Sequence, residues 1–450
     1  MTRDTTDIGL GLFTDLYELT MLQAYFEEGL DDTAVFSLFV RRLPNHRNVL
    51  LACGLDPVLA YLERLRFTDD DIRYLRSLPM FSEPFLSWLR GFRFTGDVYA
   101  VPEGTPVFAN EPILEIVAPI AQGQLVETYV MNQVHLETVL ASKALRVVAA
   151  AQGRPVIDFG ARRTHGVDAA VKGARAFYIA GVHATSNVMA GRLYGIPVAG
   201  TMAHSYIQAH SGEQEAFRAF MRTFPGTVLL VDTYDTLEGV RRVIDLAKRA
   251  PEEFNVGAVR LDSGDLGALA RETRRLLDAA GLQEVRIFAS SGLDEHEIAA
   301  LLTAGAPLDA FGVGTGMGVA SDAPSLDIAY KLCEYGGRGR TKLSKDKPIF
   351  PGRKQVFRRE QNGQSTGDVI ARFREDLDGR PLLRFVLQAG KRTSEGADDL
   401  QSARHRATQE IDRLPRHVTA IDPADPPYPV TVSEALQQHH ADVRDNVLAI

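Results

Sequence analysis

Residues 227–265 read TVLLVDTYDTLEGVRRVIDLAKRAPEEFNVGAVRLDSGD, and this stretch decides the fold class. Two apolar runs, which begin at Thr227 and Val256, are rich in valine and leucine and are typical of buried strands. The segment between them, 236–249, has a helical pattern. A strand, a helix and a second strand in this order form a βαβ unit, so we expect the two strands to be parallel.

The same alternation extends in both directions through the middle of the chain. Further strands are predicted to begin at Val156, Phe177, Pro197, Val285, Leu308 and Asp327. Further helices are predicted over 185–194, 213–223, 266–280 and 294–304. Some eight strands at intervals of about 20 to 30 residues indicate a parallel α/β barrel, irregular and TIM-like. An open, doubly wound sheet is the alternative.

Strand-like segments bracket this barrel at 33–43, 94–118 and 367–390. We therefore expect both chain ends to build a second domain, a β-rich α/β sandwich. The predicted boundaries are 1–135 for an N-terminal helix and the first part of the sandwich, 136–340 for the barrel, and 341–450 for the segment that returns to the sandwich and ends in a helix.

Composition excludes several classes of protein. The net charge of -8 argues against a nucleic-acid-binding protein, which needs a basic surface. Only Cys53 and Cys333 are cysteines, too few for a disulfide scaffold or a zinc site, and they suit a reducing compartment. There is no signal-like N-terminus, and no run reaches the roughly 18 apolar residues that a membrane helix needs. These features predict a soluble, cytoplasmic protein with no membrane partner.

Polar residues collect where the predicted strands end. Each strand end carries charged, hydroxylic or glycine residues, at 158–163, 181–183, 202–205, 232–235, 260–265, 289–292 and 312–318. One such cluster would be ordinary helix capping. A series of seven indicates a binding site, because the carboxyl ends of parallel strands share one edge of the sheet.

The charged residues of this edge suit a phosphorylated substrate. Arg162 and Arg260 offer planar guanidinium groups to a carboxylate or a phosphate, although an ion pair with Asp158 or Asp262 would be a purely structural use. Asp262 is a candidate for holding ribose hydroxyls. Asp265 is placed as an N-terminal helix residue.

A histidine and a glycine run complete the edge. His204 follows a buried-looking strand, where Asp232 from a neighbouring strand end would orient its ring. Glycines alternate over 312–318, which lets backbone N–H groups approach a phosphate, or simply makes a flexible turn. The run does not fit the dinucleotide fingerprint G-x-G-x-x-G.

Six stretches together resemble the nicotinate phosphoribosyltransferases, members of the type II phosphoribosyltransferase barrel group. They are TDLYELTM (14–21), DFGARRTHG (158–166), ATSNVMAGRLYGIPVAGTMAHS (184–205), VRLDSGDLG (259–267), FGVGTGMG (311–318) and PGRKQVFR (351–358). The resemblance implies conversion of nicotinate and phosphoribosyl pyrophosphate into nicotinate mononucleotide and pyrophosphate, in NAD salvage. Coupled ATP hydrolysis and Mg²⁺, held largely by pyrophosphate oxygens, are implied as well.

The resemblance also assigns roles to the substrate-binding residues. Phe159 would stack on one face of the pyridine ring, and Tyr17 from the other subunit of a homodimer would cover the opposite face. Arg260 would meet the nicotinate carboxylate or the sugar phosphate, and Arg162 the pyrophosphate. Asp262 would hold the ribose. The 5′-phosphate would lie against Ser291, Gly292, Gly314, Thr315 and Gly316.

For ATP, the resemblance implies that His204 is phosphorylated and that Asp232 orients it. Lys342, Lys345 and Lys347 are candidates for the ATP phosphates, although a solvated loop explains them equally well.

The residue at position 186 indicates whether the substrate is the acid, nicotinate, or the amide, nicotinamide. Nicotinamide phosphoribosyltransferases are expected to carry an aspartate at this position, which would repel a carboxylate, whereas Ser186 is neutral and favours nicotinate. Ser186 would otherwise be an ordinary N-terminal helix residue.

Other enzymes fit less well. A quinolinate enzyme should be shorter and more cationic. A Schiff-base aldolase barrel needs a lysine in a barrel strand, and the predicted strands hold only Lys331. A non-catalytic relative should have lost Arg162, Asp262 or His204, and all three are present.

Overall fold

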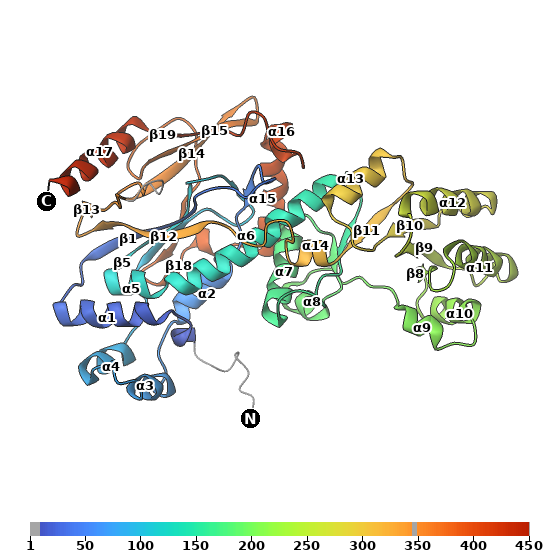
Figure 1. The fold of residues 1–450 in the computed structure, drawn as a ribbon, viewed down its shortest axis with the longest axis horizontal. Coiled ribbons are helices and arrows are strands. Elements are labelled where there is room, and N and C mark those ends of the chain that lie inside the picture. The colour runs from blue at the N-terminus through green and yellow to red at the C-terminus, as the bar shows by residue number, and fades with distance from the viewer. Residues whose placement is uncertain (1–9, 344–348, 450) are drawn as a thin grey trace. The chain divides into compact units, whose positions relative to one another are not determined.

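The computed structural model describes residues 10–343 and 349–449, which form two compact units (Figure 1). Unit 1 combines 1–142 with 325–450, and unit 2 comprises 143–324. The second β-rich domain built from both chain ends is thereby confirmed. Helix α6 (Glu127–Ala150) begins in unit 1 and ends in unit 2.

Unit 2 holds the parallel sheet. In the described part of the chain this sheet has six strands in the order β7-β6-β11-β10-β9-β8, and each neighbouring pair is parallel. The elements are β6 (Val156–Asp158), α7 (Val167–Ile179), β7 (Ala184–Thr185), α8 (Val188–Tyr194), α9 (His204–Gln208), α10 (Glu213–Thr223), β8 (Thr227–Leu230), α11 (Thr236–Arg249), β9 (Val256–Leu261), α12 (Leu266–Ala279), β10 (Arg286–Ala289), α13 (Glu295–Thr303), β11 (Ala310–Val313) and α14 (Thr315–Gly318). Helices α10, α11 and α12 pack against one another in chain order (Figure 1).

The predicted parallel α/β fold is confirmed, but its sheet is a half-barrel with six strands where eight were expected. Residues 177–181 belong to the end of α7 and the turn after it, because a short apolar run suits a buried helix as well as a strand. The segment at Pro197 makes a single bridge, between Thr185 and Val198, since proline has no N–H to donate to a ladder. The strand predicted at Asp327 is β12 (Ile328–Tyr335), which pairs antiparallel with β1 (Thr33–Val40) in unit 1.

Side-chain caps fix where the helices of unit 2 begin. A carboxylate or amide oxygen accepts a backbone N–H of the first turn at Asn187, Asp235, Asp265 and Asp294. Such caps satisfy N–H groups that have no partner within the helix. Asp158, Asp232 and Asp262 cap no helix, so capping does not explain the acids at these three strand ends.

Unit 1 contains sheets of seven, four and two described strands, in the orders β13-β12-β1-β5-β3-β17-β18, β16-β14-β15-β19 and β2-β4. All of its pairings are antiparallel except that of β15 with β19. Its remaining elements are η2 (Leu10–Leu12), α1 (Leu16–Glu28), β2 (Leu50–Leu51), α2 (Leu55–Arg64), α3 (Asp69–Arg76), α4 (Glu83–Arg90), β3 (Asp97–Ala100), β4 (Pro106–Val107), β5 (Pro112–Pro119), α5 (Ile120–Leu125), β13 (Arg338–Gly339), β14 (Lys354–Gln361), β15 (Gln364–Arg372), β16 (Arg380–Pro381), β17 (Arg384–Gln388), β18 (Lys391–Arg392), η3 (Ser394–Gly396), α15 (Leu400–Arg413), α16 (Arg416–Thr419), β19 (Val430–Val432) and α17 (Glu434–Leu448).

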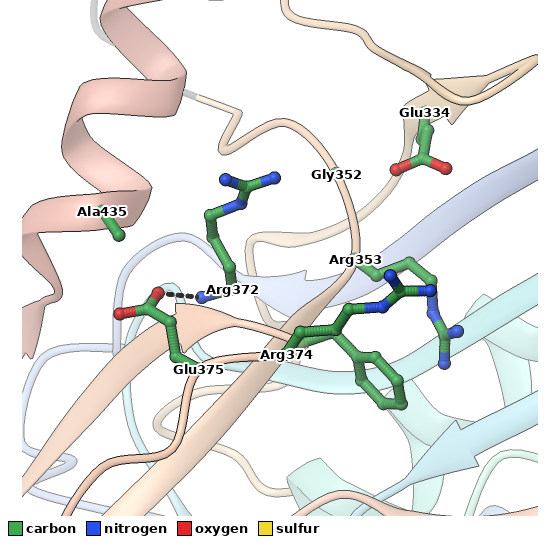
Figure 2. Close-up of a pocket in the computed structure, with 8 residues that line it drawn as sticks. Glu334, Gly352, Arg353, Arg372, Arg374, Glu375 and Ala435 are labelled. Carbon is green, nitrogen blue, oxygen red and sulfur yellow. Dashed lines mark hydrogen bonds between the residues drawn. The ribbon is translucent and has the colours of Figure 1, made fainter.

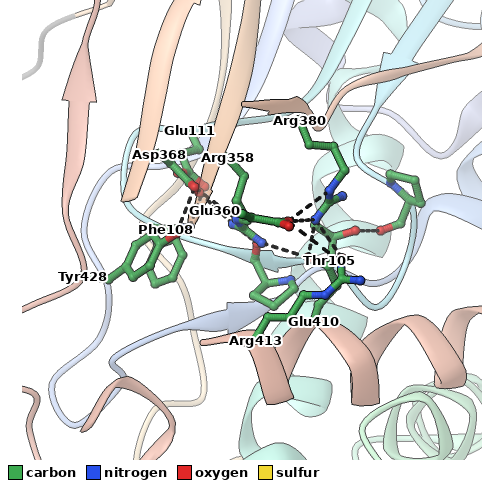
Figure 3. A network of polar contacts seen from close by, with 12 residues as sticks. Thr105, Phe108, Glu111, Arg358, Glu360, Asp368, Arg380, Glu410, Arg413 and Tyr428 are labelled. Atoms are coloured by element: carbon green, nitrogen blue, oxygen red, sulfur yellow. Dashed lines mark hydrogen bonds and ion pairs between the residues drawn. The ribbon is translucent and has the colours of Figure 1, made fainter. Parts of the chain in front are cut away.

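A buried polar network joins the two chain ends within unit 1 (Figure 3). The Arg358 side chain on β14 is fully buried, and its Nη2 lies 2.7 Å from Asp368 Oδ2. Its Nη2 also donates to the Pro106 carbonyl at 2.8 Å, and its Nη1 lies 3.4 Å from Glu410. Tyr428 donates to the same Asp368 at 3.0 Å. A buried arginine needs such partners, because an unpaired buried charge is costly.

Candidate functional site

The carboxyl edge of the parallel sheet is organised around Arg260, near the end of β9. Its Nε donates to Ser290 Oγ at 2.8 Å, and its Nη1 donates to Thr201 Oγ1 at 2.9 Å. Its Nη2 lies 3.1 Å from Asp262 Oδ2, and its Nη1 also approaches the Met202 carbonyl at 3.5 Å. The Arg260 side chain is 13 % exposed, so contacts from three segments hold this cation in one orientation.

Ser290 links the two charged groups of the edge. Its hydroxyl accepts from Arg260 and donates to Asp262 Oδ1, while Asp262 also pairs directly with Arg260. Ser290 is buried at the end of β10. Sequence reasoning selected the adjacent Ser291 and missed Ser290. The run ASSG (289–292) contains both serines, but no local pattern shows which of them points into the site.

Asp232 lies beneath Asp262 and does not bond to His204. Its Oδ2 accepts from the Asp262 backbone N–H at 3.0 Å and from the Ser263 hydroxyl at 2.6 Å. Its buried Oδ1 has no hydrogen-bond partner among the described residues. The predicted contact, in which Asp232 orients the His204 ring, is therefore not present in this structure. Asp232 instead holds the turn that follows β9.

His204 stands at the start of α9 with its ring between two strand ends. Its Nδ1 is 3.1 Å from Thr233 Oγ1, and its Nε2 is 4.0 Å from Asp262 Oδ2. The side chain is 43 % exposed, so the ring remains accessible. A hydroxyl and a carboxylate thus face its two nitrogens, which distinguishes Nδ1 from Nε2.

Phe159 forms an aromatic wall beside Arg260. The Arg260 guanidinium carbon lies 5.3 Å from the centre of the Phe159 ring, and Phe288 lies 5.9 Å from that ring. A Cβ added to Gly312 on the neighbouring strand β11 would be 2.7 Å from the Phe159 ring. Gly312 is therefore needed for this ring position.

Asp158 shapes the turn that presents Phe159. It is buried, and its two oxygens accept from the Gly160 N–H and the Thr185 hydroxyl, each at 2.7 Å. Burial raises the pKa of this carboxyl, while the two hydrogen bonds oppose the shift. Asp158 therefore supports the site and does not pair with Arg162.

Arg162 and the glycine-rich turns lie on the same edge. Arg162 is exposed, and among the described residues it has no hydrogen-bond or ion-pair partner. Its neighbour Arg163 donates to Thr315 at 3.1 Å. Ser291 has a φ of 105°, which a non-glycine residue rarely adopts and which often marks a functional turn. The other predicted residues of this edge are Ser186, which is half-buried, Gly292 and Gly314, which follow β10 and β11, and Gly316, which lies in α14.

The remaining predicted residues lie in unit 1 or outside the described residues. Tyr17 is on α1 and 48 % exposed. Lys342 follows β13, and Lys345 and Lys347 fall in the segment that the structure does not describe. No cluster of three metal-binding side chains occurs in the described ranges, and no helix described there could span a membrane.

The comparisons with known proteins agree over almost the whole chain. Residues 12–135 match the nicotinate phosphoribosyltransferase N-terminal domain model, and residues 155–349 match the nicotinate phosphoribosyltransferase family model. A nicotinate phosphoribosyltransferase of Mycobacterium tuberculosis is 56% identical over 439 residues, which cover 96% of this chain and 95% of that protein. One from Bacillus subtilis is 42% identical and covers 84% of this chain and 79% of its own length.

A solved structure extends this similarity to the fold. Human nicotinic acid phosphoribosyltransferase superposes with a TM-score of 0.85 at 29% identity, covering 96% of this chain and 100% of that chain. The chain belongs to the nicotinate phosphoribosyltransferase family.

Proposed function

We propose that this chain joins nicotinate to the phosphoribosyl group of phosphoribosyl pyrophosphate. The observation that carries the proposal is the cluster of Arg260, Asp262 and Ser290 beside the Phe159 ring, in a chain of this family. The pyridine nitrogen attacks the anomeric carbon of ribose, and the bond from that carbon to pyrophosphate breaks. No general base is required, because the pyridine nitrogen already has a free electron pair.

Arg260 and Arg162 differ in how many N–H donors each has left for a substrate. Four contacts already engage Arg260, which has only five N–H donors. Arg260 thus acts mainly as a fixed positive charge for the nicotinate carboxylate. Arg162, with no partner among the described residues, offers its full guanidinium fork to the leaving pyrophosphate. Asp262 faces the ribose, where positive charge develops.

ATP hydrolysis is coupled to this reaction through His204. Nδ1 is engaged by Thr233, so Nε2 is the nitrogen that attacks the γ-phosphate, and ADP leaves. Water then cleaves the N–P bond, which releases phosphate and restores His204. Incubation with γ-labelled ATP should give an acid-labile label that His204→Ala abolishes. His210→Ala is the matched control, because this histidine bonds the Tyr206 carbonyl and lies just beyond the C-terminal end of the same helix. Label that persists in His204→Ala would exclude His204 as the acceptor.

Mg²⁺ fits the edge only as an ion carried by the substrate. The unpartnered Asp232 Oδ1 and the Asp262 carboxylate are oxygen ligands of the kind it prefers, but two side chains make no cage. Bound there with pyrophosphate, it would neutralise charge on the leaving group. Tyr17 from a second subunit would cover the pyridine ring in a homodimer. We place the protein in the cytoplasm.

Ser186 is proposed to set the preference for the acid over the amide. A carboxylate at this position would face the negative charge of nicotinate. Ser186→Asp should lower nicotinate turnover far more than it lowers thermal stability. Ser87→Asp adds the same charge at an exposed position on α4, outside the site, and serves as the control. Unchanged nicotinate turnover in Ser186→Asp would show that Ser186 does not set the preference for the acid.

The decisive assay supplies phosphoribosyl pyrophosphate with nicotinate or nicotinamide, with and without ATP. Nicotinate mononucleotide should form, and ATP should increase its yield. Consumption of nicotinamide with nicotinate ignored would overturn the proposal. A Schiff-base mechanism is excluded, because the six described strands of the parallel sheet contain no lysine and Lys331 lies in unit 1 beside Glu127.

A further inference from the structure

Unit 1 contains a cavity of about 450 Å³ that the reaction above does not use (Figure 2). It is lined by Glu334, Gly352, Arg353, Arg372, Phe373, Arg374, Glu375 and Ala435. Its volume is in the range of small-molecule sites. Figure 2 shows Arg353 and Arg374 on one side of the cavity and Arg372 and Glu375 on the other.

Arg353 is held between aromatic rings and not by an acid. Its guanidinium carbon lies 3.6 Å from the centre of the Phe373 ring and 4.3 Å from that of Tyr99. Tyr99 in turn stacks on Phe385 at 4.7 Å. Cation–π contacts of this kind hold the guanidinium in place and leave its charge without a counter-ion. Its Nε and Nη2 are shielded from solvent and have no hydrogen-bond partner among the described residues.

The other two arginines are also without a counter-ion. Within the described ranges, neither the Arg372 nor the Arg374 guanidinium forms an ion pair or hydrogen bond, and both residues are exposed. Glu375 directs Oε1 at the Arg372 backbone N–H and at the Ser433 hydroxyl, at 2.6 and 2.7 Å. This carboxylate therefore bonds neutral donors, and three guanidinium groups surround one cavity without a direct partner.

We propose that this cavity binds a phosphate group, carried by a phosphate ester or present as free phosphate. Three guanidinium groups can donate to the oxygens of one phosphate, and charge-assisted bonds of this kind are the strong ones. The contacts that hold Arg353 in place reduce the ordering cost of binding. Glu334, which Figure 2 shows on the same side of the cavity as Arg353, is an acceptor for hydroxyl groups of a sugar attached to the phosphate. The site is distinct from that of the proposed barrel reaction, because none of the residues that line it is assigned to that reaction.

Equilibrium dialysis of the full chain against radiolabelled inorganic phosphate and against ribose 5-phosphate tests the site. The double variant Arg372→Gln/Arg374→Gln should lose one class of phosphate site, with affinity reduced at least about tenfold. Arg359→Gln, an exposed arginine on β14, is the matched control and should bind like the wild type. Arg162→Gln should weaken the barrel site and leave the cavity site unchanged, which separates this proposal from the proposed function.

Two further variants define the ligand. Arg353→Lys keeps the positive charge but loses the guanidinium contacts with Phe373 and Tyr99, so it should weaken binding. Thermal unfolding of this variant reports whether the fold is intact. Tighter binding of ribose 5-phosphate than of phosphate, lost in Glu334→Gln, identifies an ester, whereas equal binding identifies free phosphate. Unchanged affinity and stoichiometry in the folded double variant would overturn the proposal.

Discussion

Removal of the Ser290 hydroxyl is the sharpest test of how the barrel edge is organised. Ser290→Ala deletes the group that accepts from Arg260 Nε at 2.8 Å and donates to Asp262. Arg260 and Asp262 keep their direct contact at 3.1 Å, and Arg260 keeps its bond to Thr201. The variant therefore disturbs the orientation of both charged groups without removing either charge.

The size of the effect follows from these contacts. A hydrogen bond to a charged group contributes about 1.5–3 kcal/mol. Two such bonds are lost, but Asp262 is 26 % exposed, so water can replace part of its loss. We expect a net loss of about 2 kcal/mol in transition-state stabilisation, which corresponds to a decrease of about 30-fold in kcat/KM.

The assay is steady-state formation of nicotinate mononucleotide, together with thermal unfolding of each variant. Ser87→Ala is the control, because this serine is exposed on α4 and no described residue bonds its hydroxyl. KM for nicotinate should rise, because Arg260 faces a carboxylate that is already charged in the ground state, and kcat should fall, because Asp262 faces the positive charge that develops on ribose. A Ser290→Ala variant of unchanged stability whose kcat/KM stays within about twofold of wild type would refute the reasoning.

Three further outcomes are expected. Gly312→Ala should displace the Phe159 ring and raise KM for nicotinate about fivefold, the equivalent of one aromatic contact. Burial raises the pKa of Glu18 to about 7, so the free energy of unfolding should fall as pH rises from about 4.5 through 7, and Glu18→Gln should abolish that fall in urea unfolding. Arg358→Met should lower the free energy of unfolding by about 3–5 kcal/mol, because Asp368 would keep a buried, unpaired charge.

Each of these variants has a matched control. Gly212→Ala places its Cβ in open space and should leave KM unchanged. Glu27→Gln changes an exposed carboxylate on the same helix as Glu18, and the pH dependence of unfolding should persist. Arg359→Met alters the exposed neighbour of Arg358 and should change stability by less than about 0.5 kcal/mol. Equal effects in a variant and its control would contradict the corresponding prediction.

Local patterns were sufficient for much of unit 2. The helices predicted over 213–223 and 236–249 coincide with α10 and α11. Such segments combine a helical pattern with a polar start, which are short-range features. The run at 177–181 was wrongly predicted as a strand, because apolar residues buried on every side look alike in a helix and in a strand.

Contacts between strand ends were harder to predict. Both Asp232 and Asp262 were identified as site residues, but the carboxylate nearest His204 is that of Asp262. The groups that fix Arg260, namely Thr201 and Ser290, come from segments separated from it by 59 and 30 residues. No pattern within one segment encodes a hydrogen bond of that separation.

The sequence by itself determined most of the alternation of strands and helices in unit 2, the place of Asp265 at the start of its helix and the polar character of the strand ends. Each of these depends on spacings of a few residues, which the chain carries directly. The tertiary structure decided that β11 lies between β6 and β10, which brings Gly312 against Phe159 and leaves room for its ring. It also decided which serine and which acid hold Arg260. Those contacts depend on strand order and register, which are set by the packing of the whole sheet.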